Sequence, residues 1–300
     1  MFRSPRFHRS ALKVKRSFSQ YDFLTLRSAC KFRRKTEIFV STKSVFQPIE
    51  SGGFSSGRIR LFNADCFAFL PSIPPASVDL VLIDPPYEVS RDTNFQSGKA
   101  TGKNTDRFRV SMDFGTWDNG FTGLDTVIRE AYRILKNGGT LICFYDVWKI
   151  TVLKRYFENA GFKQLRLIEW IKTNPVPLNS KTNYLTNARE IAVSGVKKSK
   201  PTFNSLYDDG IYKYPICHDK GRFHPTQKPL ALIERLILKH SNAEDTILDC
   251  FFGSGTTAVA ACNTGRRFIG CEISKEYCQK AVKRLQETCP PFQRGNNADG

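Results

Sequence analysis

The sequence predicts an α/β domain with a mainly parallel sheet. From residue 58 onward, short apolar runs typical of buried strands alternate with segments whose apolar residues recur at helical spacing. Strands that alternate with helices in this way favour a parallel sheet covered by helices. The run VDLVLI (78–83) is apolar at all but one position, as expected of a strand that is buried on both faces.

The helices and strands are expected at definite places. A helix at 124–135 shows apolar residues three and four positions apart, and NGG (137–139) should end it. A second helix should end near Gly161, and two more are expected at 229–240 and 275–286. The expected strands are 58–62, 78–83, 140–145, 165–171, 190–195, 245–252 and 266–273.

The composition suits one folded domain with a basic extension. The chain has 300 residues, of which 40% are hydrophobic, enough for a substantial core. The formal net charge of +18 favours a polyanionic partner such as nucleic acid. Residues 1–60 hold 14 Lys and Arg against 3 Asp and Glu, so the rest of the chain is closer to neutral.

The same patterns divide the chain into three regions. Residues 1–57 end in the flexible stretch SGGFSSG, and we expect a disordered basic arm. Their Arg- and Ser-rich, acid-poor start is also typical of an organellar transit peptide, which stays the alternative. Residues 58–288 should form the folded domain, with a long loop at 88–119, and residues 289–300 a loose tail.

Nine cysteines are scattered along the chain without a C-x-x-C pair. We therefore expect buried, reduced thiols in a cytoplasmic protein, and neither a disulfide framework nor a metal site. No apolar run reaches the ~18–20 residues of a membrane span, so no membrane partner is expected.

A carboxylate, two prolines and an aromatic ring follow the strand at 78–83. They are Asp84, Pro85, Pro86 and Tyr87, in the stretch IDPPYEVS. The prolines end the strand, since neither has a backbone N–H to donate to a neighbouring strand.

A glycine loop follows another expected strand, in DCFFGSGTTAVAACNTG (249–265). Gly253 and Gly255 allow a sharp turn and a close approach to a ligand. Glu272 ends the next strand, where an acid can bind ribose hydroxyls. The loop lacks the third glycine of the dinucleotide fingerprint and the lysine of a P-loop. A dinucleotide, ATP and S-adenosylmethionine stay open as ligands, as does a purely structural turn.

Together these stretches resemble the amino-group DNA methyltransferases of the β arrangement, over about residues 58–286. That family carries D-P-P-Y early, H-P-T-Q-K-P later and D-x-F-x-G-S-G-T-T last. The matching positions here are 84–87, 224–229 and 249–257, and NADC (63–66) and WIKTNPVP (170–177) resemble two further family motifs. Cys250 is a departure, because proline is common there. The resemblance implies a Rossmann-like, S-adenosylmethionine-dependent methyltransferase fold with a circularly permuted motif order.

The resemblance also implies S-adenosylmethionine as the methyl donor. Glu272 would hold its ribose, and Asp65 would lie near the adenine ring, with an N-cap as the alternative for Asp65. His224 and Lys228 would meet the methionine end, with a helix-entry residue and a solvated base as their alternatives. The glycine-loop residues that would line the pocket are Asp249, Phe251, Gly253, Gly255, Thr256 and Thr257.

The chemistry of such enzymes explains the residues at the first strand end. An exocyclic amine is a poor nucleophile because its lone pair is delocalised into the ring. The Asp84 side chain and the Pro85 carbonyl, held rigid by Pro86, would accept its two hydrogens and stabilise the developing positive charge. The base must leave the duplex, at a cost of a few kcal/mol, and Tyr87 would stack on it.

We therefore predict a site-specific DNA methyltransferase that acts on N6 of adenine in duplex DNA, because D-P-P-Y goes mainly with adenine in the family. The alternatives are methylation of cytosine N4, a catalytically silent DNA-binding relative, and methylation of RNA or of protein amides. The resemblance places the target-recognition segment at about 195–223, where Lys197 and Asn204 are candidate DNA contacts. A bacterial or phage source is expected. A homodimer and a companion restriction endonuclease are left open.

Overall fold

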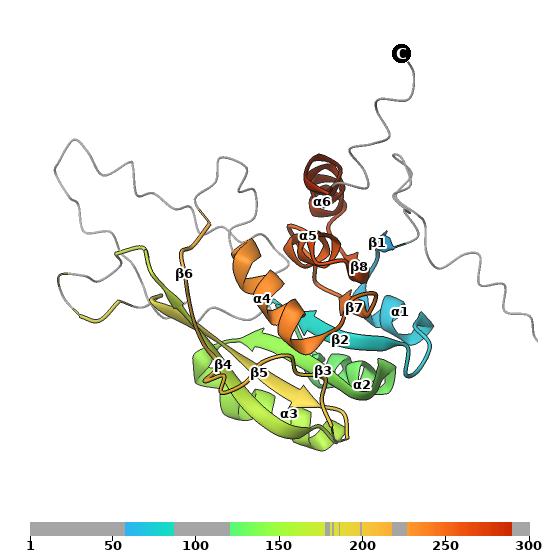
Figure 1. Cartoon of the computed structure of the whole chain (residues 1–300), viewed down its shortest axis with the longest axis horizontal. Helices are drawn as coiled ribbons and strands as arrows, with labels where there is room; N and C mark the ends of the chain where they lie inside the picture. The colour runs from blue at the N-terminus through green and yellow to red at the C-terminus, as the bar shows by residue number, and fades with distance from the viewer. Residues whose placement is uncertain are drawn as a thin grey trace, which may run out of the picture. The chain divides into compact units, whose positions relative to one another are not determined.

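The computed structural model describes residues 58–86, 121–177, 181, 183–185, 187–198, 200–217 and 227–289 (Figure 1). In these residues an eight-stranded sheet lies between two layers of helices. None of the helices in this part of the chain is long and apolar enough to cross a membrane. The expected α/β domain with a mainly parallel sheet is confirmed. Residues 1–57 and most of the tail lie outside the described residues.

The sheet has the strand order β1-β8-β7-β2-β3-β5-β4-β6. Neighbouring strands pair in parallel, except that β5 lies between β3 and β4 and is antiparallel to both. The strands are β1 (Ile59–Asn63), β2 (Val78–Ile83), β3 (Leu135–Tyr145), β4 (Lys163–Lys172), β5 (Arg189–Val196), β6 (Ile211–Tyr214), β7 (Thr246–Asp249) and β8 (Arg267–Glu272).

Alternate residues of β2 face the two helical layers, which explains why the run is apolar. Leu80 and Leu82 pack in the core formed with α4, α5 and α6, whereas Val81 and Ile83 pack in the core formed with α1, α2 and α3. The α-helices are α1 (Cys66–Phe69), α2 (Leu124–Ile134), α3 (Ile150–Ala160), α4 (Leu230–His240), α5 (Thr256–Asn263) and α6 (Lys275–Thr288).

Two helix ends follow signals in the sequence. α3 ends at Gly161, whose φ of 99° is left-handed and whose N–H donates to the Glu158 carbonyl at 3.0 Å. α6 starts after Ser274, whose hydroxyl oxygen accepts from the Tyr277 N–H at 3.3 Å. The expected end near Gly161 is confirmed.

The NGG stretch was expected to end the helix, but α2 already ends at Ile134 and NGG lies inside β3, which begins at Leu135. The Gly138 N–H donates to the Lys197 carbonyl, and the Lys197 N–H donates to the Gly139 carbonyl, each at 2.9 Å. A Cβ on Gly139 would lie 2.8 Å from the Asp79 carbonyl oxygen. Glycine here therefore allows close strand packing.

β6 was not expected from the sequence, and it lies within the segment 195–223. It pairs in parallel with β4 at the edge of the sheet. The indole N–H of Trp170 donates to the Tyr214 carbonyl at 2.9 Å, and the Asn174 side chain accepts from the Ile216 N–H at 2.7 Å. Part of the expected recognition segment thus belongs to the sheet, secured by the WIKTNPVP stretch.

The strand order reverses between β7 and β2, at the middle of the sheet. β7 leads through α5 to β8 on one side, and β2 leads to α2 and β3 on the other. α5 and α2 pack on opposite faces of the sheet. Ligands of open α/β sheets bind at the carboxyl ends of strands where the strand order reverses in this way. The fold therefore predicts a site past Ile83 and Asp249.

The packing of α4 yields a stability prediction. Leu236 is fully buried under the sheet, whereas Leu238 on the same helix is 42% exposed. Leu236→Ala should lower the free energy of unfolding by about 2–5 kcal/mol, because it leaves a cavity. Leu238→Ala is the matched control and should change it by less than about 1 kcal/mol. Urea titrations would measure both, and equal losses would contradict this account of the core.

Candidate active site

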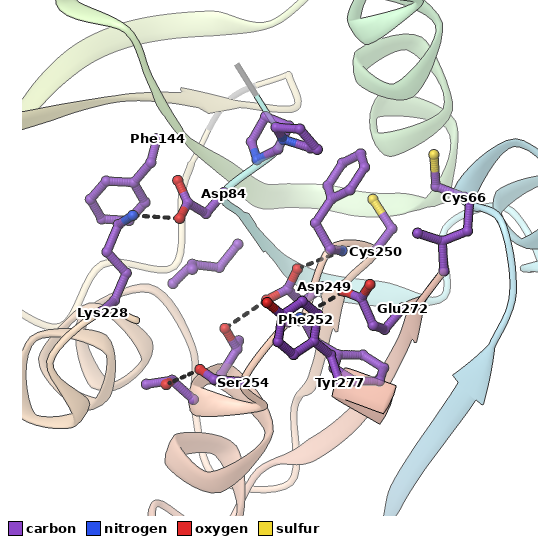
Figure 2. A pocket seen from close by; sticks show the side chains of 18 of the residues that line it. Cys66, Asp84, Phe144, Lys228, Asp249, Cys250, Phe252, Ser254, Glu272 and Tyr277 are labelled. Carbon is purple, nitrogen blue, oxygen red and sulfur yellow. Dashed lines mark hydrogen bonds and ion pairs between the residues drawn. The ribbon is translucent and has the colours of Figure 1, made fainter. Parts of the chain in front are cut away.

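A pocket opens at the predicted place, between the ends of β2 and β7 (Figure 2). Its walls come from segments far apart in the sequence. One wall is formed by the end of β2, another by the glycine loop after β7, and the remainder by the start of α1, the segment before α4 and the end of β8. The predicted site residues that line it are Asp65, Asp84, Pro85, Pro86, Lys228, Asp249, Phe251, Gly253, Thr256, Thr257 and Glu272.

Asp84 stands one residue past β2, where the two prolines end the strand. Its Oδ2 accepts a hydrogen bond from the Lys228 ammonium. Its Oδ1 is shielded from solvent and has no hydrogen-bond partner among the described residues. Burial raises the pKa of Asp84, and the charge of Lys228 opposes that rise. The pocket thus contains a carboxylate with one oxygen engaged and one oxygen left for a donor.

Lys228 lies between two carboxylates and is only 6% exposed. Besides bonding Asp84, its ammonium lies 5.0 Å from the centre of the Phe144 ring (Figure 2). It also lies 3.1 Å from Glu190 Oε2. Glu190 in turn forms an ion pair of 2.7 Å with Lys172. The two positive charges keep the pKa of Glu190 below its usual value despite burial. Lys228 is therefore not a solvated surface base.

Asp249 ends β7 and holds the start of the glycine loop. Its Oδ2 accepts from the Thr257 hydroxyl at 2.7 Å, and its Oδ1 accepts from the Phe251 N–H at 3.0 Å. Burial nevertheless raises the pKa of Asp249 to about 7, and these two hydrogen bonds oppose the rise. Near neutral pH this carboxyl can therefore exchange a proton in response to a nearby charge.

Glu272 ends β8 and holds the other side of the loop. Its Oε2 accepts from the Gly253 N–H at 3.0 Å, and its Oε1 accepts from the Ser274 N–H at 2.9 Å. Burial raises its pKa. Each carboxylate oxygen has a second lone pair, so these bonds fix the side chain and leave it able to accept from a ligand hydroxyl.

Gly255 lies in the loop but does not line the pocket. Its φ is +72°, and a Cβ at this position would lie 2.9 Å from the Ala281 Cβ of α6. Its glycine therefore serves the close packing of the loop on α6, not direct ligand contact. Tyr87 and His224 lie outside the described residues, so their predicted places stay predictions.

Asp65 combines the two roles that the sequence left open. It is the N-cap of α1, with Oδ1 accepting from the Phe67 N–H at 2.7 Å, and it also lines the pocket. Nearby, the Phe121 ring packs between two aromatic rings, those of Phe67 at 5.9 Å and Phe251 at 5.3 Å between centroids. This end of the pocket is suited to a flat ring with polar edges.

The sequence patterns assigned no role to four residues of this region: Lys172, Glu190, Gln227 and Phe144. Lys172 and Gln227 lie in the motifs WIKTNPVP and HPTQKP, and Glu190 is a charged residue in an otherwise apolar strand. Two candidate DNA contacts are used by the fold instead. The Lys197 ammonium donates to the carbonyls of Arg133 and Leu135, and the Asn204 amide donates to the carbonyls of Leu238 and Ser241.

The fold and the pocket are those of an α/β enzyme in which a glycine loop and a buried carboxylate line one pocket. Residues 78–283 match the model of the family N6_N4_Mtase, described as DNA methylase. The chain belongs to this family of DNA methylases.

Named relatives cover most of the chain. Type II methyltransferase M2.DpnII of Streptococcus pneumoniae is 35% identical over 256 residues, which are 78% of this chain and 91% of that protein. Type II methyltransferase M2.LlaDCHI of Lactococcus lactis subsp. cremoris is 36% identical over 248 residues, 76% of this chain and 89% of that protein. The crystal structure of an M1.HpyAVI–SAM complex is similar with a TM-score of 0.57 and 30% identity, over 76% of this chain and 100% of that chain.

The raised pKa of Asp249 yields a prediction for stability against pH. In the unfolded chain the carboxyl ionises near pH 3.8, whereas in the folded chain it keeps its proton to about pH 7. Between these values folding takes up a proton, so this group makes the folded state less stable as the pH rises. The difference in unfolding free energy, Asp249→Asn minus wild type, should therefore rise by on the order of 4 kcal/mol between pH 3.8 and about pH 7.

Urea titrations from pH 4 to pH 8 would test this difference. Asp245→Asn, the same exchange at the turn before β7, is the matched control for the substitution itself. A difference between Asp249→Asn and the wild type that stays constant with pH would show that Asp249 ionises normally in the folded chain.

Proposed function

We propose that this chain transfers a methyl group from S-adenosylmethionine to the N6 amine of an adenine in duplex DNA, with Asp84 as the catalytic acceptor. The observation that carries this role is that Asp84 lines the pocket and its buried Oδ1 has no hydrogen-bond partner among the described residues. A buried acceptor is costly unless a donor reaches it. The amine of a substrate base is such a donor.

The pocket fits S-adenosylmethionine better than a phosphate-bearing nucleotide. Three carboxyl groups line the part between the glycine loop and α1, from Asp65, Asp249 and Glu272. Carboxylates repel phosphates, whereas they accept hydrogen bonds from ribose hydroxyls and attract a sulfonium or an ammonium. Glu272 would hold the ribose and the aromatic rings near Asp65 the adenine, while the bound group supplies an electrophilic methyl. These roles support the sequence-based choice among the three open ligands.

The end of β2 is suited to activate an amine. Asp84 Oδ1 and the Pro85 carbonyl would each accept one hydrogen of the amine, drawing its lone pair out of conjugation. Pro86 limits the rotation of the backbone that carries the carbonyl. Acceptors fixed before the reaction stabilise the positive charge that develops on nitrogen without a cost of reorganisation. Tyr87 would stack on the flipped base, as the sequence predicts.

The residues of the DNA interface stay predictions. Lys197 is not a candidate, because its ammonium bonds backbone carbonyls of the fold. The exposed lysines of the segment 195–223 in the described residues are Lys198, Lys200 and Lys213. These side chains suit phosphate contacts that position the duplex. A homodimer, a companion restriction endonuclease and a cytoplasmic location in a bacterial or phage host stay predictions of the sequence.

The role of Asp84 can be tested by replacement. Asp84→Ala should lower transfer of labelled methyl groups to duplex DNA at least about 100-fold, because a transition-state acceptor is lost. Binding of S-adenosylmethionine should persist, which calorimetry would measure. Asp125→Ala, which removes an exposed carboxylate paired with Arg129, is the control and should retain activity. Retained transfer by Asp84→Ala would refute the assigned role.

The methylated base can be identified directly. Duplex DNA treated with the protein should yield N6-methyladenine after enzymatic digestion, as measured by mass spectrometry, and no N4-methylcytosine. N4-methylcytosine alone would establish the alternative base. Parallel pools of RNA and of protein should stay unlabelled, and label in either pool without label in DNA would contradict the proposed substrate.

A further inference from the structure

Four charged side chains form a continuous row beside the pocket. Lys172 of β4 pairs with Glu190 Oε1 at 2.7 Å, Glu190 Oε2 of β5 lies 3.1 Å from the Lys228 ammonium, and Lys228 bonds Asp84 Oδ2. The row alternates in sign, so its charges balance. Lys172 and Glu190 stand behind Lys228 and do not line the pocket.

The row explains why only one oxygen of Asp84 is engaged. A lysine side chain has a flexible stem and three N–H donors. An unrestrained ammonium can therefore bridge both oxygens of a carboxylate. Here Glu190 draws the ammonium from one side, and the face of the Phe144 ring lies 5.0 Å away. With the ammonium fixed in this way, Oδ2 is occupied and Oδ1 has no partner among the described residues.

We propose that Glu190 is a positioning residue for methyl transfer: it fixes the Lys228 ammonium on Oδ2 of Asp84 and keeps Oδ1 available to the amine of the target base. Lys172 fixes Glu190 by pairing with its other oxygen. The inference rests on the proposed catalytic role of Asp84. It assigns a role to two strand residues that do not line the pocket.

Glu190 also acts on Asp84 through its charge. Burial is the largest influence on the pKa of Asp84 and raises it, Lys228 lowers it, and Glu190 raises it in turn. The more basic carboxylate is the stronger hydrogen-bond acceptor. The titratable and charged groups that face Asp84 are Lys228, Glu190 of β5, Lys172 of β4, Asp249 of β7 and Cys143 of β3. Cys143 stays neutral, because burial raises its pKa.

Glu190→Gln tests the inference, because it keeps the shape of the side chain and removes its charge. The turnover number with duplex DNA should fall about tenfold, while KM for S-adenosylmethionine changes less than about twofold. The acid limb of the pH–rate profile should move to lower pH by about one unit, because loss of a like charge lowers the pKa of Asp84 and transfer needs its ionised form. A purely structural residue would not move this limb.

Glu169→Gln is the matched control. Glu169 lies on the adjacent strand β4 and pairs with the exposed Arg189 at 2.9 Å, outside the pocket. The same exchange there should leave the turnover number and the acid limb unchanged. The double variant Lys172→Gln/Glu190→Gln restores the balance of charge, so it should fold even if the single variant does not. Its acid limb should lie between those of Glu190→Gln and the wild type, because Lys172 lowers the pKa of Asp84 and its removal partly offsets the loss of Glu190.

The possible results are distinct. A wild-type protein that methylates no DNA would defeat the proposed function itself. With an active wild type, a Glu190→Gln variant with the wild-type turnover number and acid limb would overturn the positioning role. A lower turnover number with an unmoved acid limb in both Glu190 variants would also overturn it, since Glu190 would then serve folding alone.

Discussion

The parallel pairing of β2 with β7 is the constraint on which the site depends. Leu80 lies opposite Ile247 and Val81 opposite Leu248, so the two strands end at the same edge of the sheet. Each strand end carries an aspartate, Asp84 or Asp249. Because α5 and α2 leave this edge toward opposite faces, the pocket opens between the two carboxyl groups. The methyl donor and the target amine of the proposed function would therefore meet at this edge of the sheet.

The two aspartates differ because their neighbours differ. Asp249 is held by a hydroxyl and a backbone N–H, and burial raises its pKa to about 7. Asp84 is held by the Lys228 ammonium, which opposes the effect of burial on its pKa. The first carboxyl can respond to the charge of a bound cation by releasing its proton, whereas the second keeps a salt-bridged partner. Asp249 and Asp84 line one pocket but differ in how readily they release a proton, so they suit different chemical roles.

The sequence revealed those parts of the site that depend on local patterns. β2 lies at 78–83 as expected, and the glycine loop and Glu272 line the pocket. The direction of the Lys228 side chain was not predictable, since its partners Asp84 and Glu190 come from distant segments of the chain. β6 was missed for a related reason: four residues carry a weak pattern, and bonds from the WIKTNPVP stretch secure the chain around them. Local periodicity does not predict such contacts between distant segments of the chain.

The distribution of charge also favours different places for the two substrates, DNA and the cationic methyl donor. The chain as a whole is basic, with a net charge of +18, whereas carboxyl groups line the pocket. Basic side chains, many of them in residues 1–60, attract the phosphate backbone of DNA, whereas the carboxylates of the pocket repel it. Only an uncharged part of the duplex, a base turned out of the stack, can approach Asp84 at low electrostatic cost. The cationic methyl donor has the opposite preference and is drawn inward. The charges of the row from Lys172 to Asp84 balance, so the row does not change this difference between exterior and pocket.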